Sequence, residues 1–150
     1  MKISKALKVK NRFAGELAKL QGILARENSR RSDGSSQVDR EAVDFSIEEA
    51  RGKLIAIKAA ITVASSGIAR QLAELAETKA EISYTEGLPT KHGTEQVHSY
   101  GGTTATTVTY DAYINQEEVD KRISELQVRA NALQDSIDEY NATTDVAFDE

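Results

Sequence analysis

The chain has 150 residues, enough for one domain (1–150) with a hydrophobic core, and it contains no cysteine and no tryptophan. The absence of cysteine excludes disulfides, thiolate metal sites and cysteine nucleophiles. The net charge of −5 is unevenly divided: residues 1–31 hold nine basic and two acidic side chains, whereas residues 115–150 hold three basic and ten acidic ones. The two ends of the chain are therefore predicted to lie side by side.

The first predicted helix covers residues 3–28, because apolar residues follow one helical stripe that only Lys10 interrupts. This stripe consists of Ile3, Ala6, Phe13, Leu17, Leu20 and Leu24. Residues 28–37 are rich in Ser, Asn, Asp and Gly, which indicates a loop that exposes Arg30 and Arg31. Asp39 follows the loop and is predicted to cap the next helix.

The second predicted helix, residues 40–64, has the most regular pattern of the chain. Its apolar residues are spaced four, three, four, three, four and three apart, which is the heptad pattern of a helix packed along its length on another helix. They are Val43, Ile47, Ala50, Leu54, Ile57, Ile61 and Ala64. We call this set the first seam.

The pattern is interrupted at Ser65, Ser66 and Gly67 and then resumes at Ile68. One interpretation is a continuous helix from residue 40 to residue 86. The other, which the turn preference of serine beside glycine favours, is a break at Gly67 followed by a third helix over residues 67–86. Gly87 and Pro89 are expected to end that helix.

Residues 95–112 change to Thr, Val, Tyr and Gly, and two β-prone runs flank Gly101 and Gly102, so a β-hairpin is predicted there. A capping box, Asn115 to Glu118, then precedes the last predicted helix over residues 116–142. The acidic tail, residues 143–150, is expected to be frayed. The fold class is therefore all-α: three to four long helices in antiparallel, coiled-coil-like hairpins, with a small β-hairpin inserted before the last helix.

No catalytic, cofactor-binding or metal-binding residue is predicted. His92, Glu95 and His98 are the best candidates for a metal site, but their spacing matches no motif that puts three ligands on one face. The glutamates at 74, 77 and 81 have the spacing of a solvated helix face. Gly101 and Gly102 lack the lysine and the glycine spacing of a phosphate-binding loop.

The basic first helix could contact nucleic acid, but the sequence pI of about 5.2 and the lack of a reading motif argue against it. A signal peptide and a membrane-spanning run of about 20 apolar residues are not expected, so the predicted location is cytoplasmic. Membrane binding through the amphipathic helices is disfavoured because the seams are regular enough for partner helices and tryptophan is absent.

Both ends of the chain carry a resemblance to a known family. Ala6 and Leu7 with the Leu17–Leu20 seam at the start, and Leu133, Ile137 and the run Asn141-Ala142-Thr143-Thr144-Asp145-Val146 at the end, resemble the septicolysin-like family of small bacterial and phage-borne helical proteins. The resemblance implies an all-helical hairpin fold of unassigned function, and the family name suggests membrane lysis. The sequence lacks the long apolar hairpin that lysis would need.

Taken together, these patterns predict a non-enzymatic helical scaffold or interaction protein that self-assembles into a homo-oligomer through its helix faces and the β-hairpin. A membrane-interacting or lytic module is the alternative. An enzyme with a site around the hairpin is a third hypothesis, and its candidate residues are His92, Glu95 and His98.

Overall fold

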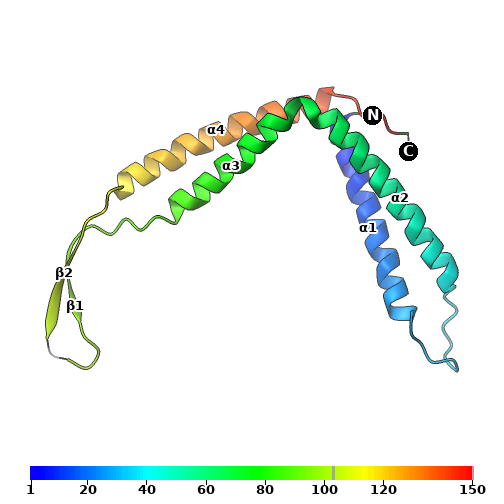
Figure 1. Cartoon of the computed structure of the whole chain (residues 1–150), viewed down its shortest axis with the longest axis horizontal. Helices are drawn as coiled ribbons and strands as arrows, with labels where there is room; N and C mark the ends of the chain where they lie inside the picture. Colours follow the sequence, from blue (N-terminus) through cyan, green and yellow to red (C-terminus); the bar gives the residue numbers. More distant parts are fainter. Residues whose placement is uncertain (103, 150) are drawn as a thin grey trace. The chain divides into compact units, whose positions relative to one another are not determined.

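The computed structural model describes residues 1–102 and 104–149. It is mostly helical, with a small antiparallel β-hairpin before the last helix, as predicted (Figure 1). In chain order the elements are α1 (Ile3–Glu27), α2 (Arg40–Ala64), the 3₁₀ turn η1 (Ser65–Ile68), α3 (Ala69–Glu86), β1 (Gly93–His98), β2 (Ala105–Tyr110) and α4 (Gln116–Thr143).

Contacts within the chain divide it into two compact units. The first unit contains residues 1–69 together with residues from 137 onward, and the second contains residues 70–136. The chain was predicted as one domain, and each unit is described below by itself.

In the first unit, α1 packs along α2 (Figure 1). The first seam of α2 faces this contact: Ile47, Ala50, Leu54 and Ile57 are buried. On α1 the buried residue between Ala6 and Phe13 is Val9, whereas the predicted stripe ran through Lys10. The reason is spacing, because steps of three and four from Ala6 through Val9 to Phe13 keep the seam apolar.

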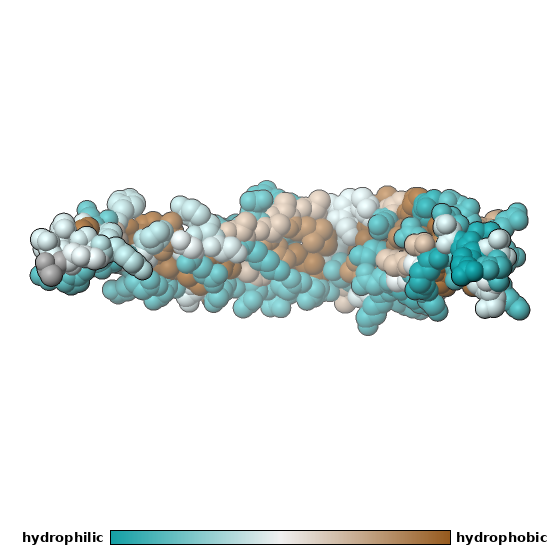
Figure 2. Space-filling view, turned by 90° about the horizontal axis from the view of Figure 1, so that it is seen from below, coloured by the Kyte–Doolittle hydropathy of each residue, from teal (hydrophilic) through white to brown (hydrophobic). Residues whose placement is uncertain are grey.

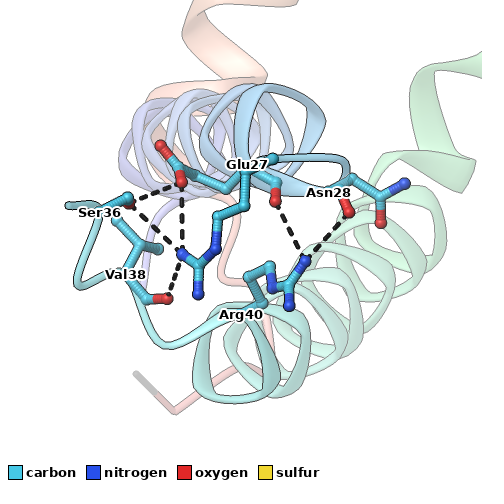
Figure 3. Close-up of polar contacts among 6 residues, drawn as sticks. Glu27, Asn28, Ser36, Val38 and Arg40 are labelled. Carbon is cyan, nitrogen blue, oxygen red and sulfur yellow. Dashed lines mark hydrogen bonds and ion pairs between the residues drawn. The ribbon is translucent and has the colours of Figure 1, made fainter. Parts of the chain in front are cut away.

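Residues 28–37 form a loop that exposes Arg30 and Arg31, as predicted, and arginine side chains connect this loop to the ends of α1 and α2. Arg40 donates to the main-chain oxygen of Asn28 at 3.1 Å, so the first residue of α2 caps the end of α1 (Figure 3). The Arg30 guanidinium donates to the Val38 oxygen at 3.1 Å. Ser36 donates to the Glu27 carboxylate at 2.7 Å, and this hydrogen bond is the main cause that lowers the pKa of Glu27.

Asp39 caps α2 as predicted, since its carboxylate accepts from the Ala42 amide at 3.1 Å. At the other end of α2 the predicted break at Gly67 is wrong. Helical structure continues through η1 into α3, and the helical run extends from Arg40 to Glu86. Serine and glycine tighten the helix here to a 3₁₀ turn, and they do not end it.

A side chain from α4 explains why the tightened turn contains glycine. The Tyr140 hydroxyl donates to the Ala64 oxygen at 3.0 Å. A Cβ atom on Gly67 would lie 2.6 Å from that hydroxyl, so any other residue here would require the Tyr140 side chain to shift.

The tail after α4 packs against the N-terminus, contrary to the predicted fraying. Its residues 144–148, which we call the C-terminal strap, pair with Met1 and Lys2: the Val146 amide donates to the Met1 oxygen at 2.6 Å, and the Ile3 amide donates to the Thr144 oxygen at 3.0 Å. Val146 is 2% exposed and belongs to the core of the first unit. The two oppositely charged ends meet at the strap, where Lys2 pairs with Asp145 at 2.9 Å.

The second unit contains α3, the hairpin and most of α4. Leu75, Val119 and Ala130 are buried in it. Asn115 caps α4 by accepting from the Glu118 amide at 2.8 Å, as the capping box predicts. The Glu118 carboxylate does not close the box, because it binds Arg122 at 2.9 Å.

The hairpin pairs β1 with β2 in antiparallel register, from Gly93 opposite Tyr110 to His98 opposite Ala105. It begins and ends two residues earlier than the predicted range of 95–112. Each strand has a single partner among the described residues, so the outer edges of both strands are open.

Candidate interaction surface

The helix that forms the core of the first unit has a second apolar face. Seven residues of α2 spaced three, four, three, four, three and four apart are all exposed. They are Ala42, Phe45, Glu49, Gly52, Ala56, Ala59 and Val63, and we call this set the second seam. It has the same heptad period as the first seam.

Helical geometry explains why one seam is covered and the other is not. Successive residues turn by about 100°, so the second seam points away from the face that α1 covers. Phe45 is 67% exposed and Val63 is 75% exposed, and Ile55 at 61% lies beside the seam. Exposed apolar side chains of this size on one helix face are typical of an interaction surface. Figure 2 shows hydrophobic residues in patches on one face of the molecule.

Two shallow hollows flank the ends of the second seam. One, of about 360 Å³, is lined by Ala59, Ala60, Val63 and Ala64 of α2 and by Asp145 and Ala147 of the C-terminal strap. The other, of about 480 Å³, surrounds Phe45 and is lined otherwise by Asp39, Glu41, Ala42 and Ser46. The first hollow is walled mainly by alanine methyl groups, so it can accept an apolar side chain.

Both signs of charge occur along α2. Residues 40–52 carry the acids Glu41, Asp44, Glu48 and Glu49 together with Arg40 and Arg51, and residues 53–64 carry Lys53 and Lys58. Glu48 and Arg51 pair within the helix. Within residues 1–102 and 104–149, neither Glu49 nor Lys53 forms an ion pair. Glu49 within the second seam and Lys53 beside it are thus available to a partner.

The helical run Arg40–Glu86 is long and apolar enough to cross a membrane by length and composition, which the sequence was not expected to provide. Only 17% of the most apolar 18-residue window in this run is buried in the structure. The second seam contributes to this window because Ala56, Ala59 and Val63 lie next to the first-seam residues in sequence.

The histidines predicted as the best metal-site candidates are not brought together with Glu95. The Glu95 carboxylate pairs with Lys91, and this hydrogen bond lowers the pKa of Glu95 and raises that of Lys91. His92 accepts at Nδ1 from the Ala112 amide at 3.2 Å. Glu95 and His98 occupy opposite faces of β1, because side chains alternate along a strand.

Within the described ranges, no group of three or more His, Asp or Glu side chains is placed to hold a metal ion. Of the glutamates predicted on a solvated face, Glu74 is bound by Arg70 at 2.9 Å, and Glu77 and Glu81 are exposed. Glu81 lines a shallow hollow with Arg122, Glu125, Leu126 and Arg129 of α4.

Comparison with known proteins adds no further assignment. No family model, curated protein or solved structure matches the chain. The strongest functional feature is therefore the second seam, which the sequence analysis missed. Alternating steps of three and four residues counted from Ala42, and not only from Val43, would have revealed this second pattern.

Proposed function

We propose that this chain is a non-enzymatic helical scaffold that self-assembles into a homo-oligomer. The observation that carries the proposal is the exposed second seam of α2, with Phe45 and Val63 in solvent. Burying such side chains is favourable by about 25 cal/mol for each Å² of apolar surface removed from water. A partner helix with the same period can cover them in coiled-coil-like packing.

The hairpin offers a second contact of the same kind. Both strands have open edges, and Val97, Tyr100 and Tyr113 are exposed on or beside it. Open edges pair readily with strands of another chain. In this proposal the helix faces and the hairpin connect copies of the chain, and the protein works in the cytoplasm as an assembled structure.

The experiment is a measurement of molar mass in solution by sedimentation or light scattering, from low micromolar to submillimolar protein. The proposal expects a mass above the 16.4 kDa of one chain, rising with concentration toward a whole multiple. A mass of one chain throughout this range would overturn it.

One observation favours a second candidate function, a membrane-interacting or lytic module. It is the helical run Arg40–Glu86, whose length and composition suit a membrane. The resemblance to the septicolysin-like family points the same way through its name. Flotation with lipid vesicles and release of an entrapped dye test this candidate, and a protein that neither floats nor releases dye rejects it.

A further inference from the structure

The solvent-facing side of α1 carries a row of positive charge. Residues spaced alternately three and four apart follow this side, and none of them is acidic. They are Lys5, Lys8, Arg12, Gly15, Lys19, Gly22 and Arg26. The five basic residues are all exposed, and we call them the basic stripe. At about 1.5 Å for each residue, the stripe extends over roughly 32 Å of the helix. We infer that the basic stripe binds an anionic lipid surface through charge, without insertion into the bilayer.

The basic stripe lies on the side of α1 that faces away from the core of the first unit. Successive residues of a helix turn by about 100°, which places the stripe roughly 150° around α1 from its buried residues. Those residues are Ile3, Ala6, Val9 and Phe13. A Cβ atom on Gly15 or Gly22 would meet no atom within 4 Å, so among the described residues nothing covers the stripe at these points. The stripe is therefore open to a partner.

The charges of the stripe have little compensation on their own helix. Lys5, Lys8 and Lys19 form no ion pair within the part of the chain that the structure describes. The only acids of α1 are Glu16 and Glu27, and the Glu27 carboxylate is engaged by the loop that follows α1. At about 0.1 M salt, forces between exposed charges are largely screened beyond about 10 Å. The net charge of −5 of the whole chain therefore does not cancel the local attraction of the stripe for an anionic surface.

A flat anionic surface matches this straight row of charge better than nucleic acid does. Lipid headgroups move laterally, so all five side chains can meet negative charge at once, and roughly four to eight Lys or Arg on an amphipathic helix are typical of binding to acidic lipids. The phosphate strands of a duplex wind around its axis, so a straight row of about 32 Å follows neither strand. The aromatic residue of α1, Phe13, is buried, so α1 has no ring to stack on the bases of a single strand.

The packing of α1 limits how the protein can meet a bilayer. An interfacial helix inserts its apolar face among the lipid chains. The apolar face of α1 is already covered by α2, so only its basic side chains are available to the lipid. The binding is therefore peripheral, and it depends neither on the proposed self-assembly nor on the helical run Arg40–Glu86. It is distinct from the lytic candidate, in which that run enters the membrane.

Flotation with lipid vesicles tests the inference on the full chain. Vesicles of equal parts phosphatidylglycerol and phosphatidylcholine should carry the protein upward at about 0.1 M salt and release it at about 1 M, where screening acts within about 3 Å. Vesicles of phosphatidylcholine alone should not carry it. A dye entrapped in the anionic vesicles should stay inside, because no part of the protein is inserted.

Paired substitutions locate the binding on the stripe. Lys8→Gln combined with Lys19→Gln should lower the partition coefficient about 25-fold, since each basic residue near an acidic lipid surface contributes about fivefold. Lys79→Gln combined with Lys121→Gln removes the same charge from exposed positions of the second unit and is the matched control, which should lose much less. Lys8→Arg combined with Lys19→Arg keeps the charge and should keep the binding. Far-ultraviolet circular dichroism checks that each variant is folded.

Several outcomes would overturn the inference. Flotation with neutral vesicles, flotation that persists at high salt, or dye release would show that lipid chains and not headgroup charges bind the protein. An equal loss in the stripe pair and in the control pair would assign the binding to net charge. Stripe-dependent binding to DNA without flotation would assign the stripe to nucleic acid, and stripe-dependent loss of oligomer mass without flotation would assign it to a second copy.

The result is separable from that of the proposed self-assembly. A monomer that floats with anionic vesicles and depends on the stripe would overturn self-assembly and leave the inference standing. An oligomer that does not float would overturn the inference alone.

Discussion

The C-terminal strap is predicted to stabilise the first unit, and Val146→Ala measures how much. Val146 is 2% exposed, in a core formed with Ile3, Ala6, Val9, Phe13, Leu54 and Ile57. Its main chain is fixed on both sides: its amide donates to the Met1 oxygen at 2.6 Å and its carbonyl accepts from the Met1 nitrogen at 3.0 Å. The substitution leaves these bonds in place and removes only side-chain packing.

The magnitude follows from the lost groups. Valine exceeds alanine by two carbons, which at about 0.8 kcal/mol for each buried CH₂ gives about 1.6 kcal/mol. Incomplete collapse of the space left behind adds up to about 1 kcal/mol. The expected loss in the free energy of unfolding is therefore about 1.5–2.5 kcal/mol. Val128→Ala is the matched control, because Val128 is 69% exposed on α4. Alanine is the better helix former, so stability there should stay equal or rise by about 0.5 kcal/mol.

The assay is urea unfolding followed by far-ultraviolet circular dichroism, combined with hydrogen exchange of the Ile3 amide. That amide donates to the Thr144 oxygen, so it reports opening of the strap. Val146→Ala should lower the urea concentration at the unfolding midpoint and speed hydrogen exchange at the Ile3 amide. Val128→Ala should neither lower the midpoint nor speed the exchange. If Val146→Ala costs no more than Val128→Ala, the strap does not hold the first unit and the reasoning fails.

Three further predictions concern single contacts. Gly67→Ala should lower the free energy of unfolding by about 1 kcal/mol or more, although alanine is the better helix former, because its methyl group meets the Tyr140 hydroxyl. Tyr140→Phe removes this hydroxyl and should reduce the cost in a double-mutant cycle. If the two substitutions have additive effects, the predicted clash is refuted. Asp39→Ala should cost about 0.5–2 kcal/mol in urea unfolding through loss of the cap, and Asp39→Asn should retain most of the stability. Hydrogen bonding from Lys2 lowers the pKa of Asp145, so this pair stabilises the fold above the ordinary aspartate range, and the contribution is lost as the pH falls through the lowered pKa. Asp145→Asn should therefore reduce the fall in the free energy of unfolding as the pH is lowered through the acidic range. An unchanged fall would contradict the prediction.

Periodicity made the helical part of the fold predictable. The first seam correctly identified Ile47, Ala50, Leu54 and Ile57 as buried, because a long run of three–four steps has few other stable arrangements in water. Local capping chemistry was equally informative: the acceptors at Asp39 and Asn115 lie where the sequence places them.

What the sequence did not reveal depends on contacts between distant residues. The strap has one valine and one phenylalanine in an acidic tail, too few to show a period, and its partners are Met1 and Phe13 at the other end of the chain. The turn at Gly67 was misjudged for the same reason. Local propensity favours a break there, whereas the hydroxyl of Tyr140 occupies the space beside the glycine and binds the Ala64 oxygen.

The two seams of α2 differ in the sizes of their residues, and this difference explains why α1 covers the first seam and leaves the second exposed. The first seam has large residues along most of its length and is covered by α1 of the same chain. The second seam has its large residues, Phe45 and Val63, toward its ends and small residues, Gly52, Ala56 and Ala59, between them. Because covering the larger residues of the first seam removes more apolar surface from water, α1 packs on that seam, and the second seam remains for the partner that the proposed self-assembly supplies.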